Sequence, residues 1–379
     1  MNKRKRVLIF YITEHSGHHS AALAVEKALT YSDPDCQVLC VNAFRYTFPI
    51  LERVVHSLYL LVIKRVPIVW ERIYDNQNFF QKSQIVKRIV NRIGGIKIKR
   101  LINSYEPDVI VCTQAFPCGM VASYKKNNHD NLPLIGVLTD FAPHSFWIYD
   151  QVDYFIVPAE ESKKMFIEKG VAAKKLLSFG IPINQKFSAY CDRISVIKQY
   201  GLREDVPVVL VMGGGRGLGP IKALVGELDN LKTNLQILVV CGVNVHLYRW
   251  IQKRVFKKKI VSFQFTDQVE RLMTIASIVI TKPGGITTAE ALAKKCPMII
   301  LNPIPGQEAR NTDFLVTNKV ALKINSPEEV GKAIDCILTN PDCYNENEFV
   351  GSCRHFARPE SSLELAGFVL HCAEIYKTS

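Results

Sequence analysis

The chain has 379 residues, of which 48% are hydrophobic, and a formal net charge of +13. This length and apolar content suffice for two domains with separate cores. Its eleven cysteines are scattered without a CxxC pair, which excludes a disulfide-rich secreted module and predicts core thiols in a reducing cytosol. The early apolar run Val7–Ile12 is too short for a signal-peptide core or a transmembrane helix.

The first half of the chain alternates short apolar runs with helical segments, starting with a strand at Val7–Ile12 and a helix at Ala21–Leu29. Further strands are predicted at Cys36–Val41, Asp108–Thr113, Leu134–Leu138 and Tyr154–Pro158. Such alternation is typical of parallel sheets with crossover connections, so we expect an α/β fold.

The region between residues 44 and 106 carries apolar residues and then cations. The stretch from Glu52 to Asp75 is strongly apolar and includes Trp70; the next thirty residues contain no Asp or Glu but include Lys82, Lys87, Arg88, Arg92, Lys97, Lys99 and Arg100. Apolar surface beside a cationic stripe suits an anionic bilayer, where each cation contributes about 1 kcal/mol. A buried helix followed by a solvated basic helix is the alternative. We expect no nucleic acid partner, because aromatic platforms are not interleaved with the charges.

The second half repeats the alternation after a polar and mixed linker, Asn184–Asp205. Strands are predicted at Val206–Met212, Gln236–Cys241, Ile260–Phe265, Ser277–Thr281 and Met298–Leu301, and an amphipathic helix at Ser361–Tyr376. Directly after the first of these strands, a glycine-rich loop that includes Gly214 and Gly215 permits close approach to a diphosphate. Its spacing matches neither a P-loop nor a dinucleotide fingerprint.

The most informative stretch runs from Thr281 to Asn311. A strand, a tight Pro-Gly-Gly turn and a helix N-terminus follow in order, which places free backbone N–H groups toward an anion. The residues that we expect at the phosphates and the ribose are Pro283, Gly284, Gly285, Thr287, Glu290, Gln307, Glu308 and Asn311. Together they predict half of a nucleotide-sugar site rather than an ordinary strand–helix turn.

Four motifs in order resemble the GT-B glycosyltransferases of the monogalactosyldiacylglycerol synthase and processive diacylglycerol β-glucosyltransferase family. They are the Gly17-His18 segment, Thr139-Asp140 with His144 and Trp147, Gly180-Ile-Pro182, and the paired Thr281–Glu290 and Pro303–Asn311 segments. The resemblance implies two Rossmann-like domains that face a central cleft: 1–185 for acceptor and membrane, 186–355 for the UDP-sugar, and a returning helix at 356–379. It also implies base contacts from Phe265 and Thr266.

The same resemblance points to His18 as the catalytic base, since its loop follows the first strand at the carboxyl end of the sheet. His15 and His19 are alternatives for this role. Asp140 either polarises His18 and binds the acceptor, or caps the next turn. Trp147 fits either a lipid interface or the core. No metal or other cofactor is expected, because neither an Asp-x-Asp pair nor a His/Cys cluster with ligand spacing occurs at a cleft position.

The resulting hypothesis is an inverting enzyme that transfers glucose or galactose from a UDP-sugar to 1,2-diacylglycerol and yields a β-glycolipid. Its expected partners are the UDP-sugar, diacylglycerol and an anionic phospholipid surface, and its expected location is peripheral, on the cytoplasmic face of the cell membrane. Two alternatives are UDP-GlcNAc transfer to a lipid-linked peptidoglycan precursor and a non-catalytic lipid-binding protein.

Overall fold

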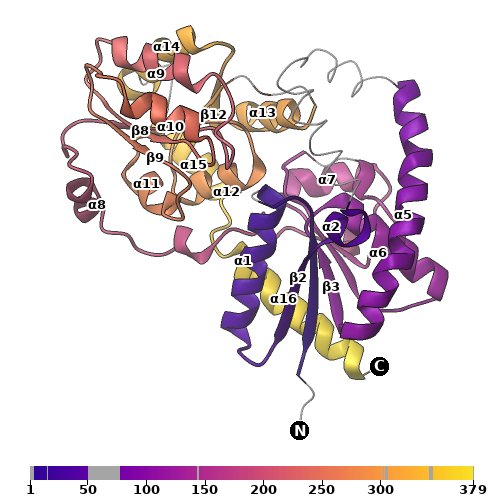
Figure 1. Cartoon of the computed structure of the whole chain (residues 1–379). Coiled ribbons are helices and arrows are strands. Elements are labelled where there is room, and N and C mark those ends of the chain that lie inside the picture. Colours follow the sequence, from indigo (N-terminus) through magenta and orange to yellow (C-terminus); the bar gives the residue numbers. More distant parts are fainter. Residues whose placement is uncertain are drawn as a thin grey trace. The chain divides into compact units, whose positions relative to one another are not determined.

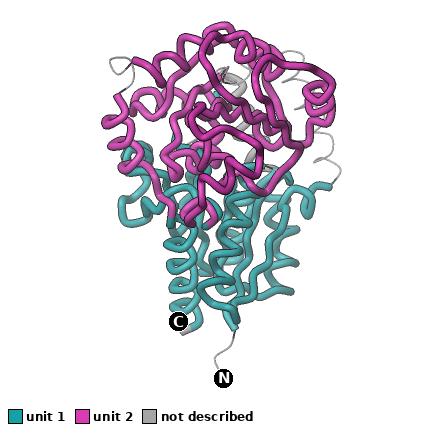
Figure 2. Tube along the Cα trace, turned by 90° about the vertical axis from the view of Figure 1, so that its left-hand side faces the viewer, with its two compact units in different colours: residues 1–185, 304–307, 360–379 teal, residues 186–303, 308–359 magenta. Residues whose placement is uncertain are grey.

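Short runs of β-branched and aliphatic residues form two parallel six-stranded sheets. The computed structural model describes residues 4–14, 16–49, 77–142, 145–301, 303, 306–340 and 345–378; of residues 77–89, 145 and 378 it describes the backbone alone. The chain divides into two compact units, coloured separately in Figure 2. Unit 1 comprises residues 1–185, 304–307 and 360–379, and unit 2 comprises residues 186–303 and 308–359.

The sheet of unit 1 has the strand order β2-β1-β3-β4-β5-β6 (Figure 1). Its strands are β1 (Arg6–Tyr11), β2 (Gln37–Asn42), β3 (Val109–Cys112), β4 (Leu134–Val137), β5 (Tyr154–Ile156) and β6 (Leu176–Leu177). The helices are α1 (Gly17–Ser32), α2 (Ala43–Thr47), α5 (Gln77–Tyr105), α6 (Ala115–Asn128), α7 (Glu160–Glu168) and α16 (Ser361–Thr378), with 3₁₀ turns at Ser145–Trp147 and Ala173–Lys175.

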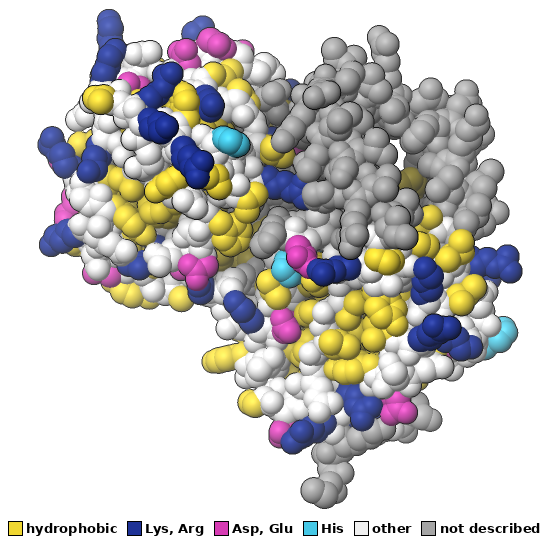
Figure 3. Space-filling model, viewed as in Figure 1, with side chains coloured by type: hydrophobic (Ala, Val, Ile, Leu, Met, Phe, Trp, Pro, Cys, Tyr) yellow, Lys and Arg dark blue, Asp and Glu magenta, His cyan; other side chains and the backbone are white. Residues whose placement is uncertain are grey.

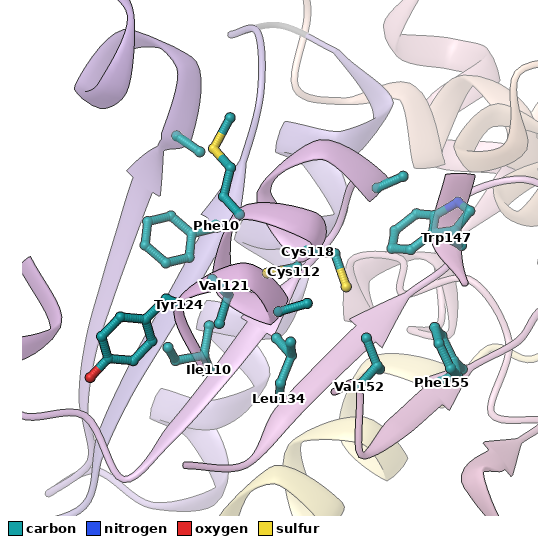
Figure 4. Close-up of a cluster of buried hydrophobic side chains, with 14 of the residues drawn as sticks. Phe10, Ile110, Cys112, Cys118, Val121, Tyr124, Leu134, Trp147, Val152 and Phe155 are labelled. Atoms are coloured by element: carbon teal, nitrogen blue, oxygen red, sulfur yellow. The ribbon is translucent and has the colours of Figure 1, made fainter. Parts of the chain in front are cut away.

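The two faces of this sheet carry separate cores, as the period-2 alternation of a strand requires. On β1, Leu8 and Phe10 join the cluster beneath α5 and α6, which Figure 4 shows in part. Val7 and Ile9 join the opposite cluster, which α1 and α16 cover. Both faces of the sheet are therefore buried, as in other helix-covered parallel sheets.

Helix α16 belongs to unit 1 although it follows unit 2 in the chain. The hydroxyl of Ser361 donates to the Ile181 carbonyl over 2.9 Å, and Lys377 pairs with Asp108 at 3.1 Å. Buried side chains of α16, Leu365, Ala366 and Val369 among them, complete the core on the α1 face.

Unit 2 has the strand order β12-β11-β10-β7-β8-β9. Its strands are β7 (Val208–Met212), β8 (Gln236–Val240), β9 (Ile260–Phe263), β10 (Ile278–Thr281), β11 (Met298–Leu301) and β12 (Ala321–Ile324). Its helices are α8 (Arg193–Gln199), α9 (Ile221–Asn230), α10 (Val245–Gln252), α11 (Val269–Ile275), α12 (Gly285–Ala293), α13 (Gln307–Thr317), α14 (Val330–Thr339) and α15 (Glu346–Phe356), with 3₁₀ turns at Gln185–Phe187 and Pro327–Glu329.

The structure corrects three details of the sequence reading. Helix α1 begins at Gly17, so His18 lies in the first helical turn and not in a loop, because Ser16 caps the helix: its Oγ accepts from the His19 N–H over 3.3 Å. The expected linker contains helix α8. Among the cysteines, Cys36, Cys112 and Cys118 are buried thiols as expected, but Cys336 is disulfide-bonded.

Candidate functional site

Each sheet has one point at which the strand order reverses. In unit 1 it lies between β1 and β3, and in unit 2 between β7 and β10. The connections that leave the two strands there diverge to opposite faces, which opens a crevice at the carboxyl edge of an α/β sheet. Each unit therefore carries candidate residues at its own reversal point.

In unit 1, the side chain of His18 bridges the reversal point. Its Nδ1 lies 3.0 Å from the carbonyl oxygen of Thr113, the residue after β3, and 2.8 Å from the hydroxyl of Thr139, which follows β4. The Thr113 hydroxyl donates in turn to the His18 carbonyl over 2.8 Å. Thr113 and Thr139 are both buried, so the imidazole is held on one edge by rigid elements.

These contacts determine which ring nitrogen carries the proton. A carbonyl oxygen only accepts, so Nδ1 of His18 is the donor and Nε2 keeps its lone pair in the neutral ring. Burial lowers the pKa of His18, while the negative charge of Asp140 and the hydrogen bond to Thr113 oppose this shift. The position in the first turn of α1 also disfavours the imidazolium. The ring of His18 is therefore neutral, with its proton on Nδ1 and a lone pair on Nε2.

The neighbouring histidines differ in their surroundings. The ring of His19 stacks on that of Tyr11, with centroids 4.5 Å apart, whereas His18 contacts the loops after β3 and β4. His15 and His144 lie outside the described residues. Among the described histidines of this segment, His18 is the one whose geometry suits a base. Asp140 acts on it electrostatically.

In unit 2, the glycine-rich loop follows β7 at the reversal point. Gly217 and Gly242 have positive φ angles of 57° and 56°. A Cβ atom on Gly217 would lie 2.1 Å from the Cys241 carbonyl oxygen, and one on Gly242 would lie 2.3 Å from the Gly215 carbonyl oxygen. Glycine is needed at both positions, because they bring the loops after β7 and β8 into contact. Gly214 and Gly215 are exposed on this loop.

The Pro-Gly-Gly turn follows β10, the strand next to β7. Gly284 is the N-cap of α12, and no side chain of the described residues caps this helix. The first-turn N–H groups thus point out of the helix end without a side-chain acceptor, which favours an anion. The hydroxyls of Thr281 and Thr288 are buried beside this turn and have no hydrogen-bond partner within the described part of the chain.

Glu290 lies one turn further along α12. Burial, together with the negative charge of Glu270, raises the pKa of its carboxyl to about 8. Glu270 is itself 9% exposed. Two carboxyl groups in one partly buried region oppose each other's ionisation. Hydrogen bonds from neutral hydroxyl groups, such as those of a ribose, or protonation would therefore stabilise the Glu290 carboxyl group.

Helix α13 carries three residues that are predicted to contact the donor, and their side chains have different partners in the structure. Glu308 lies 3.3 Å from the ammonium of Lys282 in an ion pair at the turn. Asn311 is buried, and its amide donates to the Pro283 carbonyl over 3.0 Å, so it supports the turn instead of reaching a ligand. Gln307 belongs to unit 1, where its amide donates to the Ala142 carbonyl over 2.7 Å.

The loop after β9 carries the remaining predicted contacts. The sequence reading extended this strand to Phe265, but β9 ends at Phe263. Phe265 is 56% exposed and is therefore no core residue. The Thr266 hydroxyl accepts from the Gln268 N–H over 3.2 Å. Both residues lie at the same carboxyl edge as the glycine-rich loop.

The predicted membrane contacts have mixed outcomes. Trp70 and the side chains of Lys87 and Arg88 lie outside the described residues. Arg92 is exposed on α5, next to Ile93 and Ile96, which are 43% and 64% exposed and were not singled out from the sequence. The predicted lipid contact of Trp147 is corrected by the structure. Its side chain is 6% exposed and packs in the core shown in Figure 4, so it does not face lipid.

None of the helices within the described ranges has the length and apolar content needed to span a bilayer. The sequence reading also missed Thr113, which positions His18, and Thr281 beside the turn. Thr113 directly follows β3 and Thr281 ends β10, so both lie at a reversal of strand order that only the structure shows.

Two family profiles match the chain. Residues 18–183 match monogalactosyldiacylglycerol synthase, and residues 208–348 match the glycosyltransferase family 28 C-terminal domain. The curated protein named processive diacylglycerol beta-glucosyltransferase of Bacillus cytotoxicus is 28% identical over 374 residues, which is 98% of this chain and 94% of that protein. Its namesake in Bacillus pumilus is 29% identical over 350 residues, covering 90% and 89%.

Solved structures share the fold. MurG of Acinetobacter baumannii has a TM-score of 0.64 at 15% identity and covers 97% of this chain and 100% of its own. Anabaena Alr3699/HepE in complex with UDP-glucose has a TM-score of 0.56 at 13% identity and covers 97% and 99%. The α/β fold of the GT-B class is thereby confirmed. The chain thus combines a monogalactosyldiacylglycerol synthase domain with a glycosyltransferase family 28 C-terminal domain, and nearly its whole length is similar to processive diacylglycerol β-glucosyltransferases.

Proposed function

We propose that this protein transfers a hexose, glucose or galactose, from a UDP-sugar to the free hydroxyl of 1,2-diacylglycerol with inversion, at an anionic membrane surface. Similarity to diacylglycerol glycosyltransferases over nearly the whole chain supports the acceptor and the reaction class. The observation that carries the proposal for the chemistry is the fixed imidazole of His18, with Nδ1 bound to Thr113 and Nε2 unprotonated.

In this proposal the Nε2 atom of His18 accepts the proton of the acceptor hydroxyl as its oxygen attacks the anomeric carbon. The C–O bond to UDP breaks on the opposite face of the sugar, which inverts the anomeric configuration. Asp140 stabilises the imidazolium that forms, because its negative charge already raises the pKa of His18.

The donor diphosphate is proposed to bind at the reversal point of unit 2. The first turn of α12 offers N–H groups to the β-phosphate, and Gly214 and Gly215 allow close approach from the neighbouring loop. Glu290 is proposed to accept from the ribose hydroxyls, and Phe265 and Thr266 to contact the uracil. The charge of leaving UDP is then stabilised by helix and loop N–H groups, without an assigned role for a metal.

The membrane part of the proposal rests on α5. Arg92, Lys99 and Arg100 are exposed on this helix together with Ile93 and Ile96. Cations beside apolar side chains suit a bilayer that carries anionic phospholipid, which is the source of the lipid acceptor. We propose a peripheral location on the cytoplasmic face of the cell membrane.

The test is the transfer of radiolabelled sugar to diacylglycerol in mixed vesicles, with UDP-glucose and UDP-galactose assayed separately. A β-linked product from one donor, absent with His18→Ala, supports the reaction and the base; His371→Ala, which changes an exposed histidine on α16, is the matched control. UDP binding measured by calorimetry should be retained in both variants. Bound UDP with no product from either donor would instead favour the peptidoglycan-precursor acceptor, tested with UDP-GlcNAc, or a non-catalytic protein.

A further inference from the structure

A long basic stretch lies in unit 2, away from the residues assigned to the donor. From Leu231 to Thr266 the chain contains no Asp or Glu, yet it carries seven cations: Lys232, Arg249, Lys253, Arg254 and Lys257 to Lys259. Most of them cluster on α10 and the loop between α10 and β9. Figure 3, in the view in which α10 faces the reader, shows Lys and Arg side chains around hydrophobic ones on this unit.

The cations of this stretch surround aromatic and apolar side chains. The guanidinium of Arg254 lies 4.4 Å from the ring centroid of Trp250, and the ammonium of Lys222 lies 5.5 Å from it. The ring of Phe256 meets Trp250 edge-on at 6.1 Å. Val255, which lies between Arg254 and Phe256 in the sequence, is 101% exposed. We call Trp250, Lys253, Arg254, Val255, Phe256 and Lys259 the α10 patch.

The fold leaves the charge of this patch largely uncompensated. Among the residues that the structure describes, two acidic side chains accept hydrogen bonds from the stretch, and neither bond comes from a side-chain cation. Asp229 accepts from the backbone N–H of Lys258 over 2.9 Å, and Asp335 accepts from the Thr233 hydroxyl over 3.0 Å. Lys253, Arg254 and Lys259 are exposed, and like charges held together on one loop repel each other. Such an arrangement gains most from an external anionic surface.

We propose that the α10 patch binds the surface of an anionic phospholipid bilayer, with Val255 and Trp250 entering the headgroup region. A fully exposed aliphatic tip, an amphipathic indole and flanking cations are the combination that anchors a peripheral protein. Each cation attracts anionic headgroups, and Val255 adds apolar burial. Unit 2 thus has its own membrane contact, separate from the cations of α5 in unit 1.

Nucleic acid is the other polyanion that a basic patch attracts, and the geometry of Trp250 disfavours it. A base needs an open aromatic face on which to stack. Here Arg254 covers a face of the indole and Phe256 abuts the ring, so the aromatic surface is already occupied. Binding to a bilayer does not require an open aromatic face. It requires only side chains that reach the depth of the headgroups.

The experiment measures the partition of the full chain onto sedimented vesicles, without donor and without turnover. The vesicles contain phosphatidylcholine alone or phosphatidylcholine with 30% phosphatidylglycerol, roughly the anionic content at which surface attraction becomes strong. The patch variant combines Lys253→Gln, Arg254→Gln and Lys259→Gln. The control combines Lys164→Gln, Lys198→Gln and Arg354→Gln, which neutralise three exposed cations elsewhere.

We expect the patch variant to bind the anionic vesicles about 100-fold more weakly than the unaltered chain. The control should stay within about threefold, and neither should bind neutral vesicles strongly. Val255→Ser should weaken binding severalfold and Val255→Trp should strengthen it. Because the Val255 side chain is fully exposed, neither substitution should impair folding.

Equal losses in the patch and control variants would overturn the proposal, because they would show a response to net charge alone. A patch variant that keeps its vesicle affinity but loses binding to a single-stranded DNA oligonucleotide would also overturn it, in favour of nucleic acid. The result is separable from the proposed sugar transfer: His18→Ala, inactive in transfer, should partition like the unaltered chain.

Discussion

The hydroxyl oxygen of Thr139 lies 2.8 Å from Nδ1 of His18, and the same ring nitrogen also contacts the Thr113 carbonyl. Two acceptors on one nitrogen hold the imidazole in a single tautomer and orientation. Thr139→Val keeps the shape of this buried residue but removes one of the two acceptors. We expect kcat to fall about fivefold, the equivalent of one net hydrogen bond of ~1 kcal/mol, with an unchanged KM for the UDP-sugar. Thr139→Ser, which keeps the hydroxyl, is the control; an equal loss in both variants would indicate a packing effect.

The pH dependence of transfer should report on His18. Because burial lowers the pKa of His18, the base is neutral at pH 7 and activity is lost only as pH falls below its ordinary value of about 6.5. The charge of Asp140 raises this pKa, so Asp140→Asn should move the acid limb of kcat/KM to lower pH. A limb that moves to higher pH, or stays in place, would contradict the assignment of His18 as the titrating base.

The loops after β7 and β8 offer a matched pair of substitutions. Gly242→Ala meets both a positive φ and a contact of 2.3 Å with the Gly215 carbonyl oxygen, whereas Gly214→Ala meets a positive φ with open space around it. The left-handed backbone alone costs roughly 1–2 kcal/mol in each case. Gly242→Ala should therefore lower the free energy of unfolding by more than Gly214→Ala and weaken UDP binding, measured by denaturation and calorimetry. Equal effects of the two substitutions would mean that the loops after β7 and β8 separate at little cost.

Glu290 links the stability of unit 2 to pH. Its pKa in the folded chain is raised to about 8 from an ordinary value near 4.5. A carboxyl whose folded pKa is raised contributes its full stability below pH 4.5, and this contribution is lost as pH rises through 8. Glu290→Gln mimics the protonated form, so its Tm should equal that of the unaltered chain at pH 4.5 and exceed it at pH 9. Thermal unfolding followed by circular dichroism at both pH values checks this; parallel pH profiles would show that Glu290 is solvated.

Periodicity found ten of the twelve strands in the described residues and missed β6 and β12. Met298–Leu301 coincides with β11, and the limits of most other strands differ by one or two residues. Their order was not accessible, since which strands pair depends on contacts distant in sequence. For that reason Gly17-His18 and the glycine-rich loop were recognised as motifs, while their shared position at a reversal of strand order emerged from the structure alone.

The individual roles within the site were harder to predict for a related reason. Asn311 and Trp147 have side chains that suit a ligand or a lipid as well as the interior, and burial alone distinguishes these fates. The cap by Ser16, which draws His18 into α1, depends on one side-chain hydrogen bond. Sequence reasoning therefore placed the candidate loops at the carboxyl ends of strands and misjudged residues whose role depends on the direction of the side chain.

The position of α16 has a consequence for synthesis on the ribosome. The core that contains Val7 and Ile9 is closed by Leu365 and Val369, which are translated only after the whole of unit 2. Unit 1 begins first and finishes second, and until α16 emerges one apolar face of its sheet is covered by α1 alone. During that interval the nascent chain is exposed to chaperones and aggregation, whereas unit 2, continuous in sequence apart from residues 304–307, can complete its folding earlier.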